Sequence, residues 1–228
     1  MRKGIVILGL ILLLPSIGQT QSFGVLEKIV ASDRDMRDEF GTAVSIYGNY
    51  AVVGAPIADH PLFGSLVQSG AAYIYEKSPS GSWNQIQKIQ PATPSDQERG
   101  FGHSVSISGN YILIGCPKAL LDENGLNQIA GSSNLGVGAA FIFERSFNGT
   151  WHEIQKLVAS DRAFSDQFGL AVDISGDRAI IGACWEDEDE SGFNTQDYAG
   201  SAYIFERNGS GNWNEVQKIV ASDREPQE

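Results

Sequence analysis

Lys28-Ile-Val-Ala-Ser-Asp-Arg34 is the stretch that decides the fold, because the chain repeats it. It returns as Lys156-Leu-Val-Ala-Ser-Asp-Arg162 and, unchanged, as Lys218-Ile-Val-Ala-Ser-Asp-Arg224, and a looser copy begins at Lys88. One module is therefore written several times, at a period of roughly 60–70 residues, which indicates a propeller or a solenoid. The repetition also argues against an enzyme, since a single catalytic constellation has no reason to be copied in register.

Each repeat carries the same four segments. Phe-Gly precedes an alternating run such as Ala171-Val-Asp-Ile-Ser175, and period-two alternation predicts a β-strand. Gly followed by Asn or Asp, a hairpin signal, leads to an apolar strand such as Tyr111-Ile-Leu-Ile-Gly115. An aromatic third strand (Ala202-Tyr-Ile-Phe-Glu206) and a fourth that opens with Trp213 complete the set. Four antiparallel strands with periodic Gly and aromatic motifs are typical of a propeller blade.

The predicted fold class is all-β, with three complete β-propeller blades of four antiparallel strands and an orphan N-terminal strand. The propeller segment spans 24–228, and its repeats cover approximately 32–91, 92–159 and 160–221. Residues 24–31 are the orphan strand, a fourth strand without the three before it. Closed propellers have about 4–8 blades. We therefore expect a partial or open propeller: either a fragment of a longer one, or an arc that self-associates through its open blade faces.

The pattern resembles the FG-GAP repeat of integrin α subunits and of many secreted bacterial proteins. The resemblance rests on three Phe-Gly pairs, each followed in phase by a Gly-Ala-Pro-like triplet: Gly54-Ala-Pro56, Gly115-Cys-Pro117 and Gly182-Ala-Cys184. It implies an extracellular β-propeller that binds other molecules, often in adhesion. Integrin-type repeats also carry a calcium loop between the first two strands. Here that connection is only Gly-Asn or Gly-Asp, too short to supply six to eight oxygen ligands, so this calcium site is not expected.

The N-terminus reads as a secretory signal peptide over residues 1–18. Arg2 and Lys3 precede an apolar run from Ile5 to Leu14, and small residues stand before a cut after Gly18. The run is shorter than the roughly 20 apolar residues that span a bilayer, so we expect no membrane span after signal cleavage. The expected location is secreted or extracellular, with periplasmic and cell-surface locations as variants.

Charge and cysteine content narrow the partners further. The formal net charge of −12 repels phosphate backbones, so we expect no nucleic acid partner. The only two cysteines, Cys116 and Cys184, do not form a disulfide framework, and two small buried residues are the preferred interpretation over one bridge. Asn148-Gly-Thr150 and Asn208-Gly-Ser210 are glycosylation sequons, but Asn-Gly is also what a tight turn requires, and we favour the turn.

No cofactor is expected, with calcium as the one alternative. Asp187, Asp189 and Ser191, followed by Gly192, imitate the first half of a calcium loop. No acidic residue stands at the twelfth position, so a solvated acidic loop is the competing interpretation. For catalysis, His60, His103 and His152 stand at unrelated positions of their repeats, and the chain has no nucleophile elbow, phosphate loop or CxxC motif. We expect a non-enzyme with no catalytic residues.

The variable loops predict where a partner binds. In a meander, the connections between strands two and three share one rim with the linkers between blades. The long, differing loops 57–69, 118–138 and 184–200 therefore gather on that rim, and insertions gathered on one face often mark the binding face. We predict a secreted, non-catalytic binding or adhesion module for an extracellular protein or glycan ligand. The alternative is an accessory propeller domain of a longer secreted hydrolase.

Overall fold

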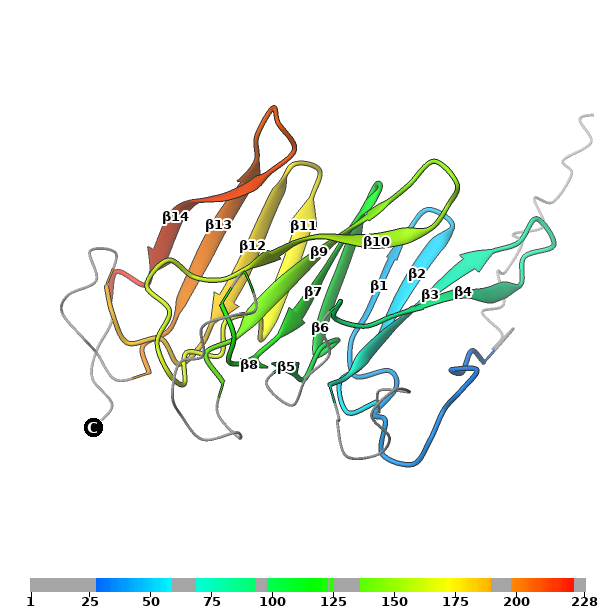
Figure 1. Ribbon diagram of the computed structural model, residues 1–228, viewed down its shortest axis with the longest axis horizontal. Coiled ribbons are helices and arrows are strands. Elements are labelled where there is room, and N and C mark those ends of the chain that lie inside the picture. The colour runs from blue at the N-terminus through cyan, green and yellow to red at the C-terminus, as the bar shows by residue number, and fades with distance from the viewer. Residues whose placement is uncertain are drawn as a thin grey trace, which may run out of the picture.

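The computed structural model of the chain describes residues 28–58, 69–92, 98–122, 124, 136–189 and 198–223. These residues form an all-β structure of three four-stranded antiparallel sheets (Figure 1). Blade 1 contains β1 (Val44–Tyr47), β2 (Tyr50–Ala55), β3 (Ala71–Lys77) and β4 (Trp83–Ile89). Blade 2 contains β6 (Ser104–Ser108), β7 (Tyr111–Cys116), β9 (Ala139–Arg145) and β10 (Trp151–Leu157), and blade 3 contains β11 (Ala171–Ser175), β12 (Arg178–Ala183), β13 (Ser201–Arg207) and β14 (Trp213–Val220).

Each sheet is a meander in which neighbouring strands in the chain are neighbours in space, as predicted. The first hairpin of every blade is closed by two residues, and the glycine at the first of these positions has a positive φ in all three blades (Gly48, Gly109 and Gly176, 56–59°). Glycine adopts this conformation without steric cost, which explains the Gly-Asn and Gly-Asp pairs. The connections have the two-residue length that the sequence predicted.

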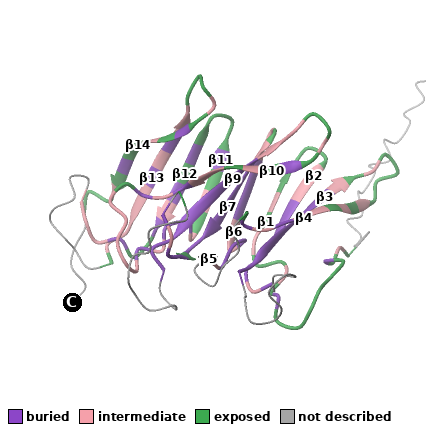
Figure 2. Cartoon of the chain, in the orientation of Figure 1, coloured by how far each residue is buried: buried purple, intermediate pink, exposed green. Residues whose placement is uncertain are grey.

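The blades lie side by side in a row, with blade 2 between the other two, and the sheets do not close into a ring (Figure 1). Buried residues concentrate in the strands of blade 2, which is covered on both faces (Figure 2). Ile112 and Ile114 of β7 pack toward Val52 of blade 1, whereas Leu113 packs toward Ile181 of blade 3. Two covered faces explain why the second strand of the repeat is apolar throughout.

The segment that precedes blade 1 lies against that blade. Residues 24–27 of the predicted orphan strand fall outside the described residues. Ala31 is buried in the cluster that contains Tyr73 and Tyr75, and the Tyr75 hydroxyl donates a hydrogen bond of 2.8 Å to the carbonyl of Val30. Ser32 N–H donates to Gln85 Oε1 at 2.9 Å. The segment therefore covers part of the face of blade 1 that points away from blade 2.

A short fourth sheet was not expected from the sequence. β5 (Glu98–Arg99) pairs antiparallel with β8 (Lys118–Ala119), at the edge of blade 2 where the linker enters and the variable loop leaves. The cysteine prediction is half right. Cys116 is buried, but Cys184 is exposed, and neither forms a disulfide. Pro56 and Pro117, which occupy the same place in the other repeats, are buried. Cys184 is exposed because no further blade covers the outer side of blade 3 among the described residues.

Candidate binding rim

The two rims of the blade row differ in their connections. The two-residue hairpins and the turns between the third and fourth strands lie on one rim, called here the turn rim (Figure 1). The interblade linkers, the β5–β8 sheet and the described ends of loops 57–69, 118–138 and 184–200 lie on the opposite rim, called here the linker rim. Most residues of those three loops lie outside the described ranges, and so do Ser191 and His60.

Both sequons lie in turns of the turn rim. Asn148 Oδ1 accepts a hydrogen bond from Thr150 N–H at 3.0 Å, and Asn208 Oδ1 accepts from Ser210 N–H at 2.9 Å. These side-chain to backbone bonds are the Asx turns that the hairpin uses. His152 is exposed at the start of β10, whereas His103 lines the groove described below.

A groove on the linker rim crosses all three blades. It has a volume of about 390 Å³ and is lined by Glu39, Pro56 and Ile57 of blade 1, by Gln167 and Leu170 of blade 3, and by residues of blade 2: Arg99, Gly100, His103, Pro117 and Lys118. The residue before each Phe-Gly phenylalanine has a positive φ (Glu39, Gly100 and Gln167), and its carbonyl closes a turn with the third residue after it. The repeat therefore places three equivalent turns, one from each blade, in the lining of one groove.

Blade 2 gives the groove a basic floor in an otherwise acidic protein. Arg99 and Lys118 are directly opposite each other in the β5–β8 pair. Like charges in facing positions destabilise a strand pair. Among the described residues, no carboxylate makes an ion pair with either cation. Burial, with a smaller contribution from Lys118, lowers the pKa of His103, so this imidazole is neutral at pH 7 and adds a hydrogen-bonding group without a charge.

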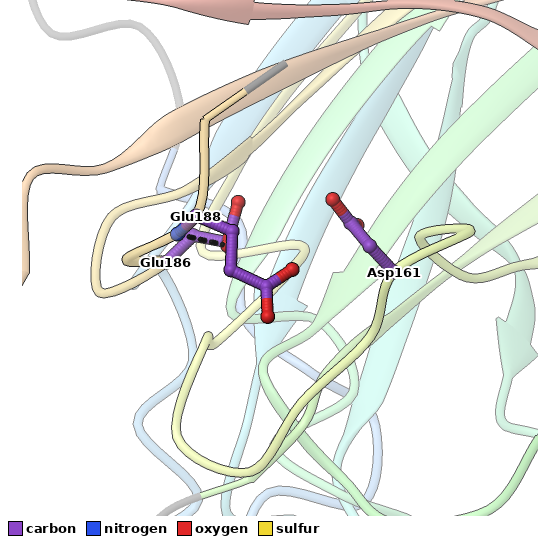
Figure 3. Close-up of side chains that lie close together, drawn as sticks. All are labelled: Asp161, Glu186 and Glu188. Atoms are coloured by element: carbon purple, nitrogen blue, oxygen red, sulfur yellow. Dashed lines mark hydrogen bonds between the residues drawn. The ribbon is translucent and has the colours of Figure 1, made fainter. Parts of the chain in front are cut away.

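The base of blade 3, also on the linker rim, holds a cluster of carboxylates. Oxygens of Asp161, Glu186 and Glu188 all lie within 4.8 Å of one another (Figure 3). Glu186 is buried, and its Oε1 accepts a hydrogen bond of 2.8 Å from the backbone N–H of Glu188. Asp187 and Asp189, the sequence candidates for calcium, are half-buried in the same loop but are not members of this group.

A lysine already neutralises much of that charge. Lys218 Nζ lies 2.6 Å from Asp161 Oδ2 and also contacts Glu186 Oε2. Burial would lower the pKa of Lys218, but the bonds to Asp161 and Glu186 outweigh it and raise the pKa, so the ammonium stays charged. The Tyr203 hydroxyl lies 2.8 Å from Asp161 Oδ1 and 2.9 Å from Glu186 Oε2 and can donate to one of them at a time. The cluster is therefore an internal ion-pair network with its own cation.

Comparison with known proteins supports the repeat. A family model described as FG-GAP repeat matches residues 23–75 and 151–205. The chain is an FG-GAP repeat protein. The first matched segment ends in β3 of blade 1, and the second begins with β10 of blade 2 and ends in β13 of blade 3. Blade 2 is a four-stranded meander like the other two. Such repeats build propeller-type binding modules and are typical of extracellular domains.

Other comparisons are distant. No curated sequence matches the chain. A solved structure of a hypothetical selenium-binding protein from Sulfolobus tokodaii aligns at 11% identity with a TM-score of 0.40, over 75% of this chain and 38% of that one. The chain thus spans well under half the length of that protein. Among the described residues, no helix is long and apolar enough to span a membrane.

Proposed function

We propose that this FG-GAP repeat protein is a secreted, non-catalytic binding or adhesion module. In this proposal an extracellular protein or glycan binds the linker rim. The observation that carries the proposal is the groove of about 390 Å³, which lies beside the variable loops and receives residues from all three blades. A pocket to which every blade contributes is a product of the whole assembly.

The chemistry of the groove favours an acidic group on the ligand. Arg99 and Lys118 face each other without an ion pair among the described residues, and their mutual repulsion is relieved by a bound carboxylate or sulfate. His103 and Gln167 add neutral hydrogen-bonding groups, and Ile57 and Leu170 add apolar walls. Acidic side chains of matrix proteins and acidic sugars carry groups of this kind. The overall negative charge of the module disfavours acidic partners elsewhere on its surface.

The test begins with the labelled chain on an array of extracellular glycans and matrix proteins, and continues with titrations of each hit. We expect hits to carry carboxylates or sulfates, and we expect Arg99→Ala/Lys118→Ala to weaken their binding at least about tenfold. Lys77→Ala/Arg178→Ala is the matched control, since it removes the same charge at the turn-rim ends of β3 and β12. Equal losses with both double variants would show a general charge effect and would refute the groove as the site.

A further inference from the structure

The two interfaces between consecutive blades are built from the same parts. A Cβ placed on Gly54 would lie 1.9 Å from the carbonyl oxygen of Gly102, and one on Gly115 would lie 1.9 Å from that of Gly169. The phenylalanines before Gly102 and Gly169 make parallel bridges, Gly70 to Phe101 and Gly138 to Phe168. Each blade thus offers a glycine-lined socket, and the next blade inserts its Phe-Gly backbone into it. Only glycine permits so close an approach.

Blade 3 carries the same socket without an occupant among the described residues. A Cβ on Gly182, the equivalent of Gly54 and Gly115, would meet only Ala171, at 3.7 Å. Gly200, the equivalent of Gly70 and Gly138, keeps their positive φ of close to 80–100° and forms no such bridge. An open hollow of small residues lies at this place, with Gly182, Gly200 and Ala202 in its wall. Gly182 is therefore a glycine at a position where nothing in the described part of blade 3 demands one.

The apolar residues around the socket are also exposed in blade 3, although the equivalent residues of blades 1 and 2 are buried. Ile180 of β12 is 39% exposed, whereas its equivalents, Val52 and Leu113, are fully buried by the following blade. Ile219 of β14 is also 39% exposed, against 4% for Ile89 and 2% for Leu157. The outer face of blade 3 is therefore an interblade face in composition and shape.

Blade 1 presents the inserting half at the other end of the row. Ile46 of β1 is 64% exposed, whereas its equivalents Ile107 and Ile174 are 5% and 4% exposed because the preceding blade covers them. Val44, beside it, is 70% exposed. A Cβ on Gly41 would meet nothing within 4 Å, although Gly102 and Gly169 are each enclosed by the preceding blade. One chain thus carries both halves of an interface that it already forms twice internally.

We propose that the outer face of blade 3 docks blade 1 of a second copy of this chain, head to tail. The Phe40-Gly41 backbone of the second copy enters the Gly182 and Gly200 socket, and its Ile46 covers Ile180. A polar contact accompanies each internal interface: Gln87 bonds both backbone groups of Trp151, and Gln155 bonds both of Trp213. Gln217 holds the third such position, on the free face, and pairs with Trp83 of the second copy.

The segment ahead of blade 1 is compatible with this docking. Ser32 N–H bonds Gln85, as Ala92 N–H bonds Glu153 and Ser160 N–H bonds Glu215 where a linker leaves one blade and crosses to the next. Lys28–Arg34 therefore stands where the linker of a preceding blade belongs. In the proposed complex, the blade that precedes blade 1 of the second copy is blade 3 of the first copy. Its linker is Lys218–Arg224, which has the same sequence as Lys28–Arg34. Lys218–Arg224 of the first copy can therefore take the place of Lys28–Arg34 on blade 1 of the second copy with the same residue at every position.

Head-to-tail contacts either close into a ring or continue as a filament. Two copies with three blades each give a six-bladed ring, within the range of about 4–8 blades that closed propellers adopt. Such a ring has two equivalent interfaces and leaves neither apolar end face exposed. Large exposed apolar faces are uncommon on proteins that remain monomeric. The docking therefore also accounts for the exposure of Ile46 and Ile180.

The test is sedimentation velocity on the purified chain and on three aspartate variants. We expect a dimer, or longer head-to-tail oligomers, that Ile180→Asp and Ile46→Asp each convert to monomer, with a dissociation constant raised about 100-fold or more. Both side chains are exposed in the single chain, so the far-ultraviolet circular dichroism spectra of the variants should match that of the wild type and show that each variant folds. Val216→Asp is the control, because Val216 is exposed in the same way as its equivalents Ile86 and Ile154 in the other blades. It should leave the oligomer intact.

Mixing distinguishes head-to-tail docking from other association. The Ile180→Asp chain keeps an intact blade 1 face, and the Ile46→Asp chain keeps an intact blade 3 face. An equimolar mixture should therefore form a one-to-one heterodimer through one unaltered interface, while each variant alone stays monomeric. A wild-type chain that is monomeric up to about 100 μM, an oligomer that survives both substitutions, or a mixture that stays monomeric would each overturn the proposal.

Discussion

The bases of blades 1 and 3 hold the same lysine, aspartate and tyrosine, yet in very different surroundings. In blade 1, Lys88 Nζ lies 2.8 Å from Asp33, whose side chain is 48% exposed. In blade 3, the Lys218 side chain is 6% exposed and contacts both Asp161 and Glu186. The difference comes from one position in the repeat. The residue that accepts a hydrogen bond from the glycine before the third strand is Ala58 in blade 1 but Glu186 in blade 3.

The repeat fixes the lysine–aspartate ion pair at the base of both blades, but it does not fix how deeply that pair is buried. The linker aspartate and the lysine of the fourth strand form an ion pair in both blades, and a cation–π contact with the tyrosine (Tyr73 or Tyr203) accompanies it. A solvated ion pair contributes little to stability, whereas a buried carboxylate that loses its cation costs several kcal/mol. The exchange of alanine for the buried Glu186 therefore makes the stability of blade 3 depend on its lysine.

Removal of the lysine should give the largest difference in stability loss between blade 1 and blade 3. Lys218→Met leaves the buried Glu186 without a cation and should lower the free energy of unfolding by about 3–5 kcal/mol. Lys88→Met breaks only a partly solvated pair and should cost about 1 kcal/mol or less. Urea unfolding at pH 7 measures both. Equal losses would contradict the distinction between a solvated and a buried pair.

The pH dependence of Asp166 should give the next largest effect. Its Oδ2 accepts a hydrogen bond from Ala163 N–H at 2.5 Å, and its Oδ1 is buried with no hydrogen-bond partner among the described residues. Burial, with a smaller contribution from Glu186 and other nearby acids, raises the pKa of Asp166 to about 7. Between pH 4 and 7 the folded chain binds the proton that the unfolded chain has released, so this residue makes stability fall as pH rises through 7.

Asp166→Asn should abolish the fall in stability that the titration of Asp166 causes as pH rises. We expect the variant to gain roughly 2–4 kcal/mol relative to wild type at pH 8, and little or nothing at pH 4. Asp38→Asn is the matched control, since Asp38 accepts the equivalent backbone hydrogen bond, from Asp35 N–H, at the start of blade 1. The measurement is urea unfolding at both pH values. A gain that does not depend on pH would show that titration of Asp166 is not its cause.

Much of the fold followed from the sequence because local signals agreed. Alternation in β11, the apolar run of β7 and the glycines of the two-residue hairpins each specify one element without reference to the rest of the chain. The stacking of blades also followed, since a strand that is apolar on both faces needs cover on both. The β5–β8 sheet gave no such signal. Two residues per strand are too few to show a period.

The carboxylate cluster of Asp161, Glu186 and Glu188 could not be predicted from the sequence, for a different reason. The repeated motif places a lysine five residues before its aspartate, but those two do not pair with each other. Lys218 pairs with Asp161, which belongs to the copy of the motif one repeat earlier, and Lys88 likewise pairs with Asp33. The acids suggested for calcium, Asp187 and Asp189, alternate with Glu186 and Glu188, which are the members of the cluster. The lysine and aspartate that recur in three copies of the motif were the one available signal.

Glu186→Ala should make the smallest change and should bring the base of blade 3 close to that of blade 1. Lys218 keeps Asp161 and Tyr203 keeps a hydrogen-bond acceptor, so the free energy of unfolding at pH 7 should change by about 1 kcal/mol or less. Loss of the Glu186 charge should also lower the pKa of Asp166, because that charge favours the protonated acid. The fall in stability with rising pH should still begin near pH 4, where the unfolded acid loses its proton, but it should end at a lower pH and be smaller than in wild type. Thermal unfolding at intervals between pH 4 and 8 would measure this displacement. An unchanged pH profile would show that the charge of Glu186 does not contribute to the raised pKa of Asp166.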